Sequence, residues 1–244
     1  MKGKILLVAG LADSLVNFRG PLIGALQAKG LQVHVAAPFP DDDEPVRATL
    51  QARGVQVHGV PLGRAATNPA SDLRTLLALW RLMRRIKPQY VLAYTVKPVI
   101  YGSLAAWLAG VPKRFALITG LGYAFQGDGT RGLLQGLVQK LYRLALAKVD
   151  KVFFQNPDDE ALFRERRILG ARVPAVVVNG SGVDVFHFEP APLPEQPCFL
   201  LIARLLGDKG VREYAEAARR IRLRHPQARF ALAGNPAAPN PGDP

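Results

Sequence analysis

Cysteine is almost absent from this chain, which carries a single one, Cys198, among 244 residues. One cysteine excludes an internal disulfide framework and favours a reducing compartment. Long apolar runs are absent as well, because none reaches the roughly 18 residues that a membrane span requires. The start, "MKGKILLVAGLADS", is basic and then apolar, but Asp13 interrupts the run and no A-x-A site follows. A first core strand is therefore a better interpretation than a signal peptide.

Acidic residues are scarce relative to basic ones. There are 19 Asp and Glu against 32 Lys and Arg, which gives a formal net charge of +13. Such an excess favours an anionic partner or surface, and nucleic acid, anionic lipid and a phosphorylated small molecule all qualify. A solvated basic surface without a partner is also compatible with the charge alone. Nucleic acid is disfavoured because the basic faces lack interleaved exposed aromatic residues.

Several signatures of cofactors and catalysis are missing. The turn after the first apolar run reads "GLADSL" rather than G-x-G-x-x-G, "TGLGYAF" has Phe125 in place of the third glycine, and there is no Walker loop. No His or Cys has a partner at metal-ligand spacing, and there is no G-x-S-x-G elbow. We therefore expect no dinucleotide cofactor and no metal. His34 and His58 are expected to be structural, and "DDDE" at Asp41–Glu44 to supply charge at a helix N-terminus.

What the chain does contain is a regular alternation of short apolar, β-branched segments and helical segments. The predicted strands are 4–10, 31–38, 55–62, 90–95, 114–120, 151–156 and 175–180. The predicted helices are 21–29, 44–54, 71–88, 100–110, one within 131–149, and 157–169. This alternation indicates an α/β fold whose parallel sheet is covered on both faces. The strand tips of such a sheet face a crevice where ligands usually bind.

The longest predicted helix, 71–88, is both apolar and basic. Ser71 is expected to cap it and Pro88 to stop it. The apolar residues expected on one face are Leu73, Leu76, Leu77, Trp80 and Met83, and the charges are Arg74, Arg81, Arg84, Arg85 and Lys87. The helix within 131–149 has a similar character. Helices of this kind suit an anionic membrane surface. The alternative is a core-facing helix with a solvated basic face.

A Pro-rich stretch interrupts the alternation. Four prolines within 189–197 indicate a linker. Residues 1–188 are then a first domain, and 198–244 begin a second one with strand 198–206, helix 209–226 and strand 228–234. One helix leaves half of a sheet uncovered, so we expect this second domain to be incomplete or to pack onto the first.

Two predicted loops place cations beside a helix N-terminus. The loop "LADSLVNFRG" follows the first strand, and its Arg19 offers a guanidinium fork suited to phosphate. The loop "ARLLGDKG" follows strand 198–206, where Arg204 and Lys209 bracket a turn suited to a diphosphate. Ordinary loops with exposed cations are the alternative for both.

Five segments together resemble the family 4 glycosyltransferases of the GT-B fold. They are "SLVNFRGPLIGALQAKGLQVHVAAP", "YTVKPVIYGSLAAWLAGVPKRFALITGLGYAF", "FFQNPDDEALF", "NGSGVDVFHF" and "FLLIARLLGDKGVREYAEAARRI". The chain looks closest to bacterial members that add sugars to lipid-linked saccharides for capsule, O-antigen or glycan assembly. The resemblance implies a Rossmann-like N-terminal domain for the acceptor and the beginning of a second Rossmann-like domain for a nucleotide sugar.

The resemblance also implies which residues form the site. Arg204 and Lys209, followed by Gly210, match the family's contacts to the donor diphosphate and would be catalytic. The residues implied on the acceptor side of the cleft are Asn17, Arg19, Thr95, Lys97, Thr119, Gly120 and Tyr123. No metal site and no cofactor are implied, because the nucleotide sugar is a substrate.

The implied reaction is a retaining transfer of a sugar from a nucleotide diphosphate sugar to a polyprenyl-diphosphate-linked or saccharide acceptor. The implied place is the cytoplasm, on the inner face of the cell membrane. The family's E-x7-E segment would lie beyond Pro244, so we expect this chain alone to turn over slowly or not at all. Two alternatives stay open: a UDP-sugar epimerase of the same fold, and a non-catalytic domain that binds anionic membranes.

Overall fold

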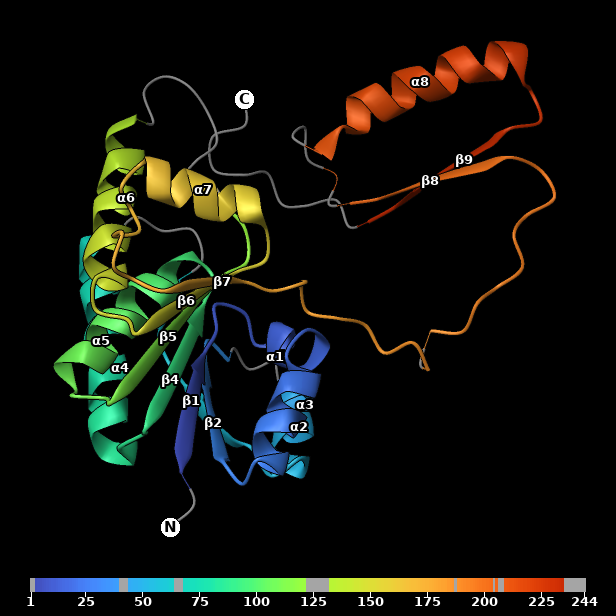
Figure 1. The fold of residues 1–244 in the computed structure, drawn as a ribbon. Coiled ribbons are helices and arrows are strands. Elements are labelled where there is room, and N and C mark those ends of the chain that lie inside the picture. The colour runs from blue at the N-terminus through green and yellow to red at the C-terminus, as the bar shows by residue number, and fades with distance from the viewer. Residues whose placement is uncertain are drawn as a thin grey trace. The chain divides into compact units, whose positions relative to one another are not determined.

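A parallel sheet forms the centre of the larger of two units into which the chain divides, Met1–Val183 and Asp184–Pro244 (Figure 1). The computed structural model describes residues 3–39, 44–63, 68–121, 132–186, 188–203, 205 and 209–234. The expected boundary after residue 188 falls inside the second unit, and the expected linker 189–197 forms neither helix nor strand.

Seven strands make up the sheet of the first unit, within the described ranges, and every neighbouring pair is parallel. In spatial order they are β3 (Gln56–Gly59), β2 (Gln32–Ala37), β1 (Lys4–Val8), β4 (Tyr90–Tyr94), β5 (Lys113–Ile118), β6 (Lys151–Phe154) and β7 (Ala175–Val177). The predicted α/β class and parallel sheet are confirmed. Because all strands point the same way, their carboxyl ends meet at one edge of the sheet.

Helices connect these strands as the alternation predicts. They are α1 (Asp13–Asn17), α2 (Gly20–Ala28), α3 (Glu44–Ala52), α4 (Pro69–Ile86), the π-helix η2 (Pro98–Gly102), α5 (Ser103–Leu108), α6 (Gly132–Leu146) and α7 (Pro157–Glu165). Glu44 lies in the first turn of α3, as expected, whereas Asp41 to Asp43 lie outside the described residues. No described helix is both long and apolar enough to cross a membrane.

Alternate residues of each strand enter two separate apolar cores, as the period of a strand dictates. Leu6 and Val8 of β1 belong to one core with α4, α5, α6 and α7, whereas Ile5 and Leu7 belong to the other with α1, α2 and α3. The first core runs the length of the sheet and includes the fully buried Phe154 of β6. The two cores make the first unit a three-layer structure.

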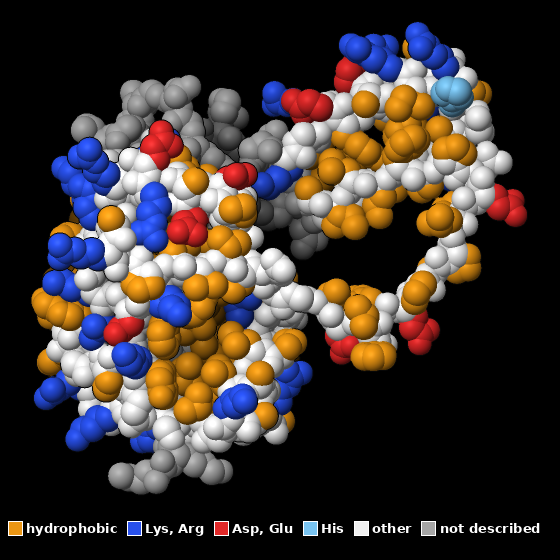
Figure 2. Space-filling view, in the orientation of Figure 1, with side chains coloured by type: hydrophobic (Ala, Val, Ile, Leu, Met, Phe, Trp, Pro, Cys, Tyr) orange, Lys and Arg blue, Asp and Glu red, His pale blue; other side chains and the backbone are white. Residues whose placement is uncertain are grey.

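Helices lie on both faces of the sheet, as predicted, but the described helices cover the two faces unequally. On the α1–α3 face, α2 packs on β2 and α3 on β3. Farther along that face, Phe115 and Phe153 are only half-buried and Val176 is exposed. Figure 2 shows hydrophobic side chains gathered where Figure 1 places β4 to β6. The described helices therefore cover the β1–β3 part of this face better than the rest.

Helix α4 begins one turn earlier than the sequence suggested. Asn68, not Ser71, caps it, because the Asn68 side chain accepts hydrogen bonds from the backbone N–H of Ala70 and Ser71, and Pro69 follows at the first helical position. The helix stops at Ile86, before Lys87 in a left-handed conformation. The expected apolar face is confirmed only in part, because Met83 is buried and Leu76 and Trp80 pack against the core, but two of its members do not. Leu79, Leu82, Met83 and Ile86 are buried, but Leu73 and Leu77 are exposed.

The segment after β1, expected to be a loop, contains the short helix α1 before α2 begins. Pro21 lies in the first turn of α2, and Gly30 follows the helix at a φ of 80°, where glycine is favoured. Both features agree with the predicted helix 21–29. The one-turn helix α1 places Ser14 and Leu15 in the core and leaves Asn17 on the surface.

The second unit contains the predicted strand–helix–strand. Strands β8 (Cys198–Ile202) and β9 (Arg229–Ala233) pair in parallel, and α8 (Val211–Arg224) connects them. The Tyr214 hydroxyl of α8 lies 2.9 Å from the backbone oxygens of both Phe199 and Ala231 and so ties the helix to the two strands. A Cβ at Gly234 would lie 1.8 Å from the Ala203 oxygen, so this strand end requires glycine.

Candidate active site

Five loops meet at the edge formed by the carboxyl ends of β1, β4, β5, β6 and β7. They carry most of the residues that the sequence singled out on the acceptor side. Two groups of polar contacts are built there. One centres on Arg19 and the other on Asp72.

Arg19 is buried, with 5% of its surface exposed. Its guanidinium lies over the ring of Tyr94, 4.7 Å from the ring centre, and its Nη1 donates to Ser181 Oγ at 2.6 Å. Gln155 donates to the same serine oxygen at 3.3 Å. Arg19 therefore joins the segment after β1 to the end of β4, the loop after β6 and the loop after β7.

The same group continues through Tyr94 to α1. The Tyr94 hydroxyl lies 2.8 Å from Ser14 Oγ, and Ser14 Oγ also donates to the backbone oxygen of Leu11. Burial raises the pKa of Tyr94, and the Ser14 hydrogen bond and the Arg19 charge oppose that rise. Burial lowers the pKa of Arg19, and Tyr94 opposes that change. Arg19 Nε is buried without a hydrogen-bond partner.

Thr95, directly after β4, has a strained backbone. It is exposed and has a φ of 69°, a conformation that β-branched residues rarely adopt. A Cβ at Gly10 would lie 2.8 Å from Thr95 Oγ1, so the glycine after β1 makes room for the threonine. The π-helix η2 begins three residues later, and short π-helical turns often occur at functional sites. Strain beside a π-helix marks this strand tip as a candidate functional position.

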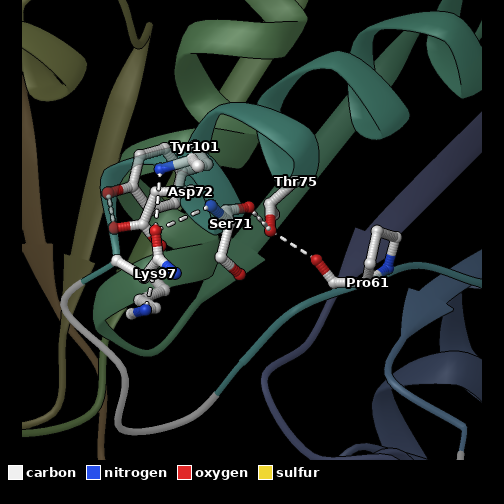
Figure 3. A network of polar contacts seen from close by, with 8 residues as sticks. Pro61, Ser71, Asp72, Thr75, Lys97 and Tyr101 are labelled. Carbon is white, nitrogen blue, oxygen red and sulfur yellow. Dashed lines mark hydrogen bonds and ion pairs between the residues drawn. The ribbon is translucent and has the colours of Figure 1, made fainter.

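Lys97 lies just beyond Thr95 and has partners within the chain (Figure 3). Its Nζ is 2.9 Å from Asp72 Oδ1, and the Tyr101 hydroxyl donates to Asp72 Oδ2 at 2.8 Å. Lys97 is buried, and Asp72 lies in the first turn of α4, where a negative charge is favourable. The pair fixes the segment after β4 against α4.

The turn that holds Asp72 is itself anchored (Figure 3). Thr75 Oγ1 donates to the backbone oxygens of Ser71, at 3.1 Å, and of Pro61, at shorter range. Pro61 follows β3, so these contacts link the start of α4 to the edge strand. The carboxylate of Asp72 is thereby held in place from two sides.

The remaining acceptor-side residues have varied environments. Asn17 and Gly120 are exposed, Thr119 is half-buried, and Gly120 has a φ of 140°. Tyr123 lies outside the described residues. Arg19 and Lys97 have partners in the chain, which the sequence did not reveal, and their roles toward a substrate stay predictions.

The residues that the resemblance assigns to the donor diphosphate belong to the second unit. Lys209 is exposed, and Gly210 has a φ of 72° at the N-cap of α8. Arg204 lies outside the described residues. Lys209 therefore lies directly before the N-cap of α8, and the rest of the predicted arrangement, Arg204 and the turn between them, is not tested. Its role toward a diphosphate stays a prediction.

Sequence reasoning missed several members of this site. Ser14, Tyr94, Gln155 and Ser181 all lie within the segments that carry the resemblance, but none was predicted to belong to the site. Asp159 was missed as well. It is buried in the first turn of α7, and burial, followed by the Asp158 charge, raises its pKa. No group of three or more His, Cys, Asp or Glu in the described part of the chain is placed to hold a metal.

Residues 4–156 match the family model described as glycosyl transferase 4-like, which is more than half of the chain. The chain belongs to this family. The glycosyl transferase 4-like match covers every strand from β1 to β6 and the loops that carry Arg19, Thr95 and Lys97. The resemblance read from the sequence is confirmed at the level of the family.

Two curated relatives are bacterial. One relative is an N,N'-diacetylbacillosaminyl-diphospho-undecaprenol alpha-1,3-N-acetylgalactosaminyltransferase of Campylobacter jejuni, to which the chain is 27% identical over 236 residues. This alignment covers 91% of this chain and 60% of the relative. The chain is 29% identical over 164 residues to a UDP-Gal:alpha-D-GlcNAc-diphosphoundecaprenol alpha-1,3-galactosyltransferase of Escherichia coli, which covers 62% of this chain and 41% of the relative. The chain thus spans less than two thirds of either family relative.

The fold is also found among solved structures. One of them is sucrose-phosphate synthase from Thermosynechococcus elongatus, with a TM-score of 0.70 and 16% sequence identity. The structural match covers 98% of this chain and 64% of the synthase chain. At that identity the likeness concerns the fold alone. It supports the GT-B-like class that the sequence predicted.

Proposed function

We propose that this protein is a glycosyltransferase that moves a sugar from a nucleotide diphosphate sugar to a polyprenyl-diphosphate-linked or saccharide acceptor during synthesis of a surface polysaccharide or glycan. The observation that carries the proposal is the glycosyl transferase 4-like match over residues 4–156. The names of the two curated relatives, both transferases acting on undecaprenyl-diphosphate-linked sugars, support the acceptor class.

The reaction exchanges one bond for another at the anomeric carbon of the sugar. The bond to the diphosphate breaks, a bond to an acceptor hydroxyl oxygen forms, and the hydroxyl proton leaves. We propose that configuration is retained and that no metal takes part. Arg204 and Lys209 would stabilise the charge that develops on the leaving diphosphate, with Gly210 and the N-terminus of α8 behind them.

The strand tips of the first unit would hold the acceptor. Thr95 and Asn17, both exposed, would hydrogen-bond it, together with Thr119 and Gly120 and with Tyr123, which the resemblance to the family implies. Arg19 and Lys97 would not contact the acceptor but would hold the loops that do, since each is buried and bonded to neighbouring residues. Rigid support of this kind keeps binding groups in a productive geometry.

The test is a transfer assay with the whole chain. It is mixed with an undecaprenyl-diphosphate-linked sugar and a panel of UDP-sugars, and mass spectrometry follows the acceptor. We expect the acceptor to bind and to gain one sugar. Absence of both acceptor binding and transfer would contradict the proposed function. An epimerase would instead change the UDP-sugar without any acceptor.

A matched pair of variants tests the donor site. Lys209→Met should lower the transfer rate on the order of 10²–10³, as loss of a charge-stabilising donor does. Arg212→Met removes the same charge from the exposed first turn of α8 and should leave the rate nearly unchanged. Equal losses in both variants would mean that Lys209 acts only through overall charge.

We also propose that the protein works in the cytoplasm at the inner face of the cell membrane. α5 packs against both α4 and α6, and all three helices expose apolar side chains. These are Leu73, Leu77, Trp107, Leu108, Leu137 and Leu144. Lys148, which follows α6, has its Nζ 4.5 Å from the centre of the Trp107 ring, and α4 carries Arg74, Arg81, Arg84 and Arg85. Apolar and basic side chains together suit an anionic lipid surface.

Vesicle sedimentation measures this membrane contact. The chain should sediment with phosphatidylglycerol vesicles and not with phosphatidylcholine vesicles, and the double variant Leu73→Ser, Leu77→Ser should weaken the association several-fold. Binding that is independent of lipid charge, or unchanged in the variant, would contradict it.

A further inference from the structure

A surface pocket of about 520 Å³ lies between the edge strand β3 and helix α4. It uses none of the strand-tip residues described above. The side chains and backbone that line it are Val57, His58, Gly59, Val60, Ala78, Arg81, Leu82 and Arg85. None of these residues is acidic, and two are arginines. Its volume is within the range of pockets that hold small molecules.

The positions of the two arginines are unfavourable for the stability of helix α4. Arg81 and Arg85 are one turn apart on α4, and like charges at this spacing repel each other. Both are exposed, and neither forms an ion pair with any residue that the structure describes. Arg85 lies in the last turn, where the helix dipole favours a cation, but Arg81 does not. An anion between the two guanidinium groups would relieve the repulsion.

His58 adds a neutral donor. Its Nε2 is 3.0 Å from Nδ1 of His34, and Nε2 of His34 is buried without a partner. If Nε2 of His34 carried a proton, the structure would contain a buried N–H without an acceptor, which is costly, so Nε2 of His34 is unprotonated. The proton of the neutral His34 ring is then on Nδ1, which donates it to Nε2 of His58. The proton of the neutral His58 ring is then on its other nitrogen, Nδ1, and this nitrogen is left free to donate.

The backbone contributes as well. β3 is the last strand at its edge of the sheet, so backbone groups on its outer side have no strand partner in the described chain. Gly59, which is exposed and lines the pocket, has no side chain to cover them. The pocket therefore combines two charged donors, one neutral ring donor and open backbone with the apolar side chains of Val60 and Leu82, which belong to the core on the α4 side of the sheet.

We propose that this pocket binds a phosphate group, held by Arg81, Arg85 and His58. A carboxylate has two oxygens, which one arginine fork can occupy alone, whereas a phosphate has enough oxygens for two arginines and a ring N–H. The phosphate belongs either to a soluble phosphorylated compound or to a lipid headgroup. The arms of the experiment separate these sources.

His58 is a built-in reporter of this binding. Burial, followed by the charge of Arg85, lowers the pKa of His58. The charged and titratable groups around the histidine pair are Arg81 and Arg85 from α4, His34 from β2 and Lys4 from β1. All are cations or can become cations, so a bound phosphate introduces the opposite charge and favours protonation of His58.

The experiment follows the histidine ring signals of the whole chain by NMR while the pH is varied, with His58→Gln assigning the His58 signal. The probes are inorganic phosphate, pyrophosphate, and phosphatidylglycerol vesicles against phosphatidylcholine vesicles, with sodium chloride matching the ionic strength. We expect a phosphate probe to raise the pKa of His58 by about half a pH unit or more. A response to the soluble probes indicates a soluble ligand, and a response to phosphatidylglycerol alone indicates a headgroup.

Matched variants decide whether the pocket is specific. Arg81→Gln and Arg85→Gln should each weaken the response at least several-fold, and the double variant should abolish it. Arg84→Gln removes the same charge from an exposed neighbour outside the pocket and should keep the response. Thermal unfolding verifies that the variants stay folded. The proposal is overturned if no probe moves the His58 signal, or if Arg84→Gln lowers the response as much as Arg85→Gln.

Discussion

Arg19 and Arg85 carry the same guanidinium group, and the structure places them in opposite environments. Arg19 is buried over Tyr94 and donates to Ser181, so it joins segments that are 162 residues apart in the sequence. Arg85 is exposed at the mouth of a pocket and has no ion-pair partner among the described residues. The contrast separates cations that hold the first unit together from cations that are available to a ligand.

Two further pairs of groups differ in the same way, one being buried and the other exposed. The ion pair of Lys97 and Asp72 is largely buried, whereas that of Arg219 and Glu216 is exposed. His34 is buried against His58, whereas His225 is exposed at the end of α8. In each case the buried member should matter for stability and the exposed member should not, because exposed charges are screened by solvent.

The largest effect is expected at Arg19. Arg19→Ala removes a buried side chain, its bond to Ser181 and its contact with the Tyr94 ring, and should lower the free energy of unfolding by about 3–4 kcal/mol. The control, Arg81→Ala, should change it by no more than about 0.5 kcal/mol. Urea unfolding followed by circular dichroism measures both. Similar losses of unfolding free energy in Arg19→Ala and Arg81→Ala would contradict the distinction between buried and exposed arginines.

A smaller effect is expected from acid. Burial, and then the charges of His58 and Lys4, lower the pKa of His34 from 6.5 to about 4. Between these pH values the unfolded chain binds more protons than the folded one, so the free energy of unfolding falls as the pH decreases through this window. The loss should be on the order of 2–3 kcal/mol. Urea unfolding at a series of pH values measures it.

The control for the pH effect is His34→Gln, which removes the titrating ring and should flatten the dependence of the unfolding free energy on pH. A pH dependence that survives in His34→Gln would assign the effect to another group.

The smallest effect is expected at Lys97. Lys97→Met removes one of the two side-chain donors to Asp72 in the described part of the chain and leaves Tyr101, so it should cost about 1–2 kcal/mol of stability. Adding Asp72→Asn should recover part of that loss, because no unpaired charge then remains. Arg219→Met, in the exposed pair, serves as the control and should have little effect. Fully additive losses at Lys97 and Asp72 would show that the pair is not coupled.

Much of the fold is predictable because apolar periodicity is local. Each predicted strand contains or overlaps the observed one, as 151–156 does for β6, and each predicted helix overlaps an observed one, although α1 was not predicted. Cap choice was less predictable. Asn68 and Ser71 are both good capping residues, and Asn68 caps while the Ser71 backbone oxygen accepts from Thr75.

The environment of the site residues was not predictable from the sequence. The burial of Arg19 depends on Tyr94 and Ser181, which are distant in the chain, and no local rule connects them. The same holds for Lys97 and Asp72, which come from different elements. The motif that contained Arg19 identified an important residue, and the three-dimensional contacts determine what that residue touches.

Thr95 illustrates how stability and activity can compete at one position. A left-handed backbone at a β-branched residue costs of order 1–3 kcal/mol, and glycine would adopt the same φ of 69° without that strain. Thr95→Gly should therefore stabilise the fold while removing the hydroxyl at the proposed acceptor site. Screens for a more stable protein would select that change, and the proposed activity would be lost in the process.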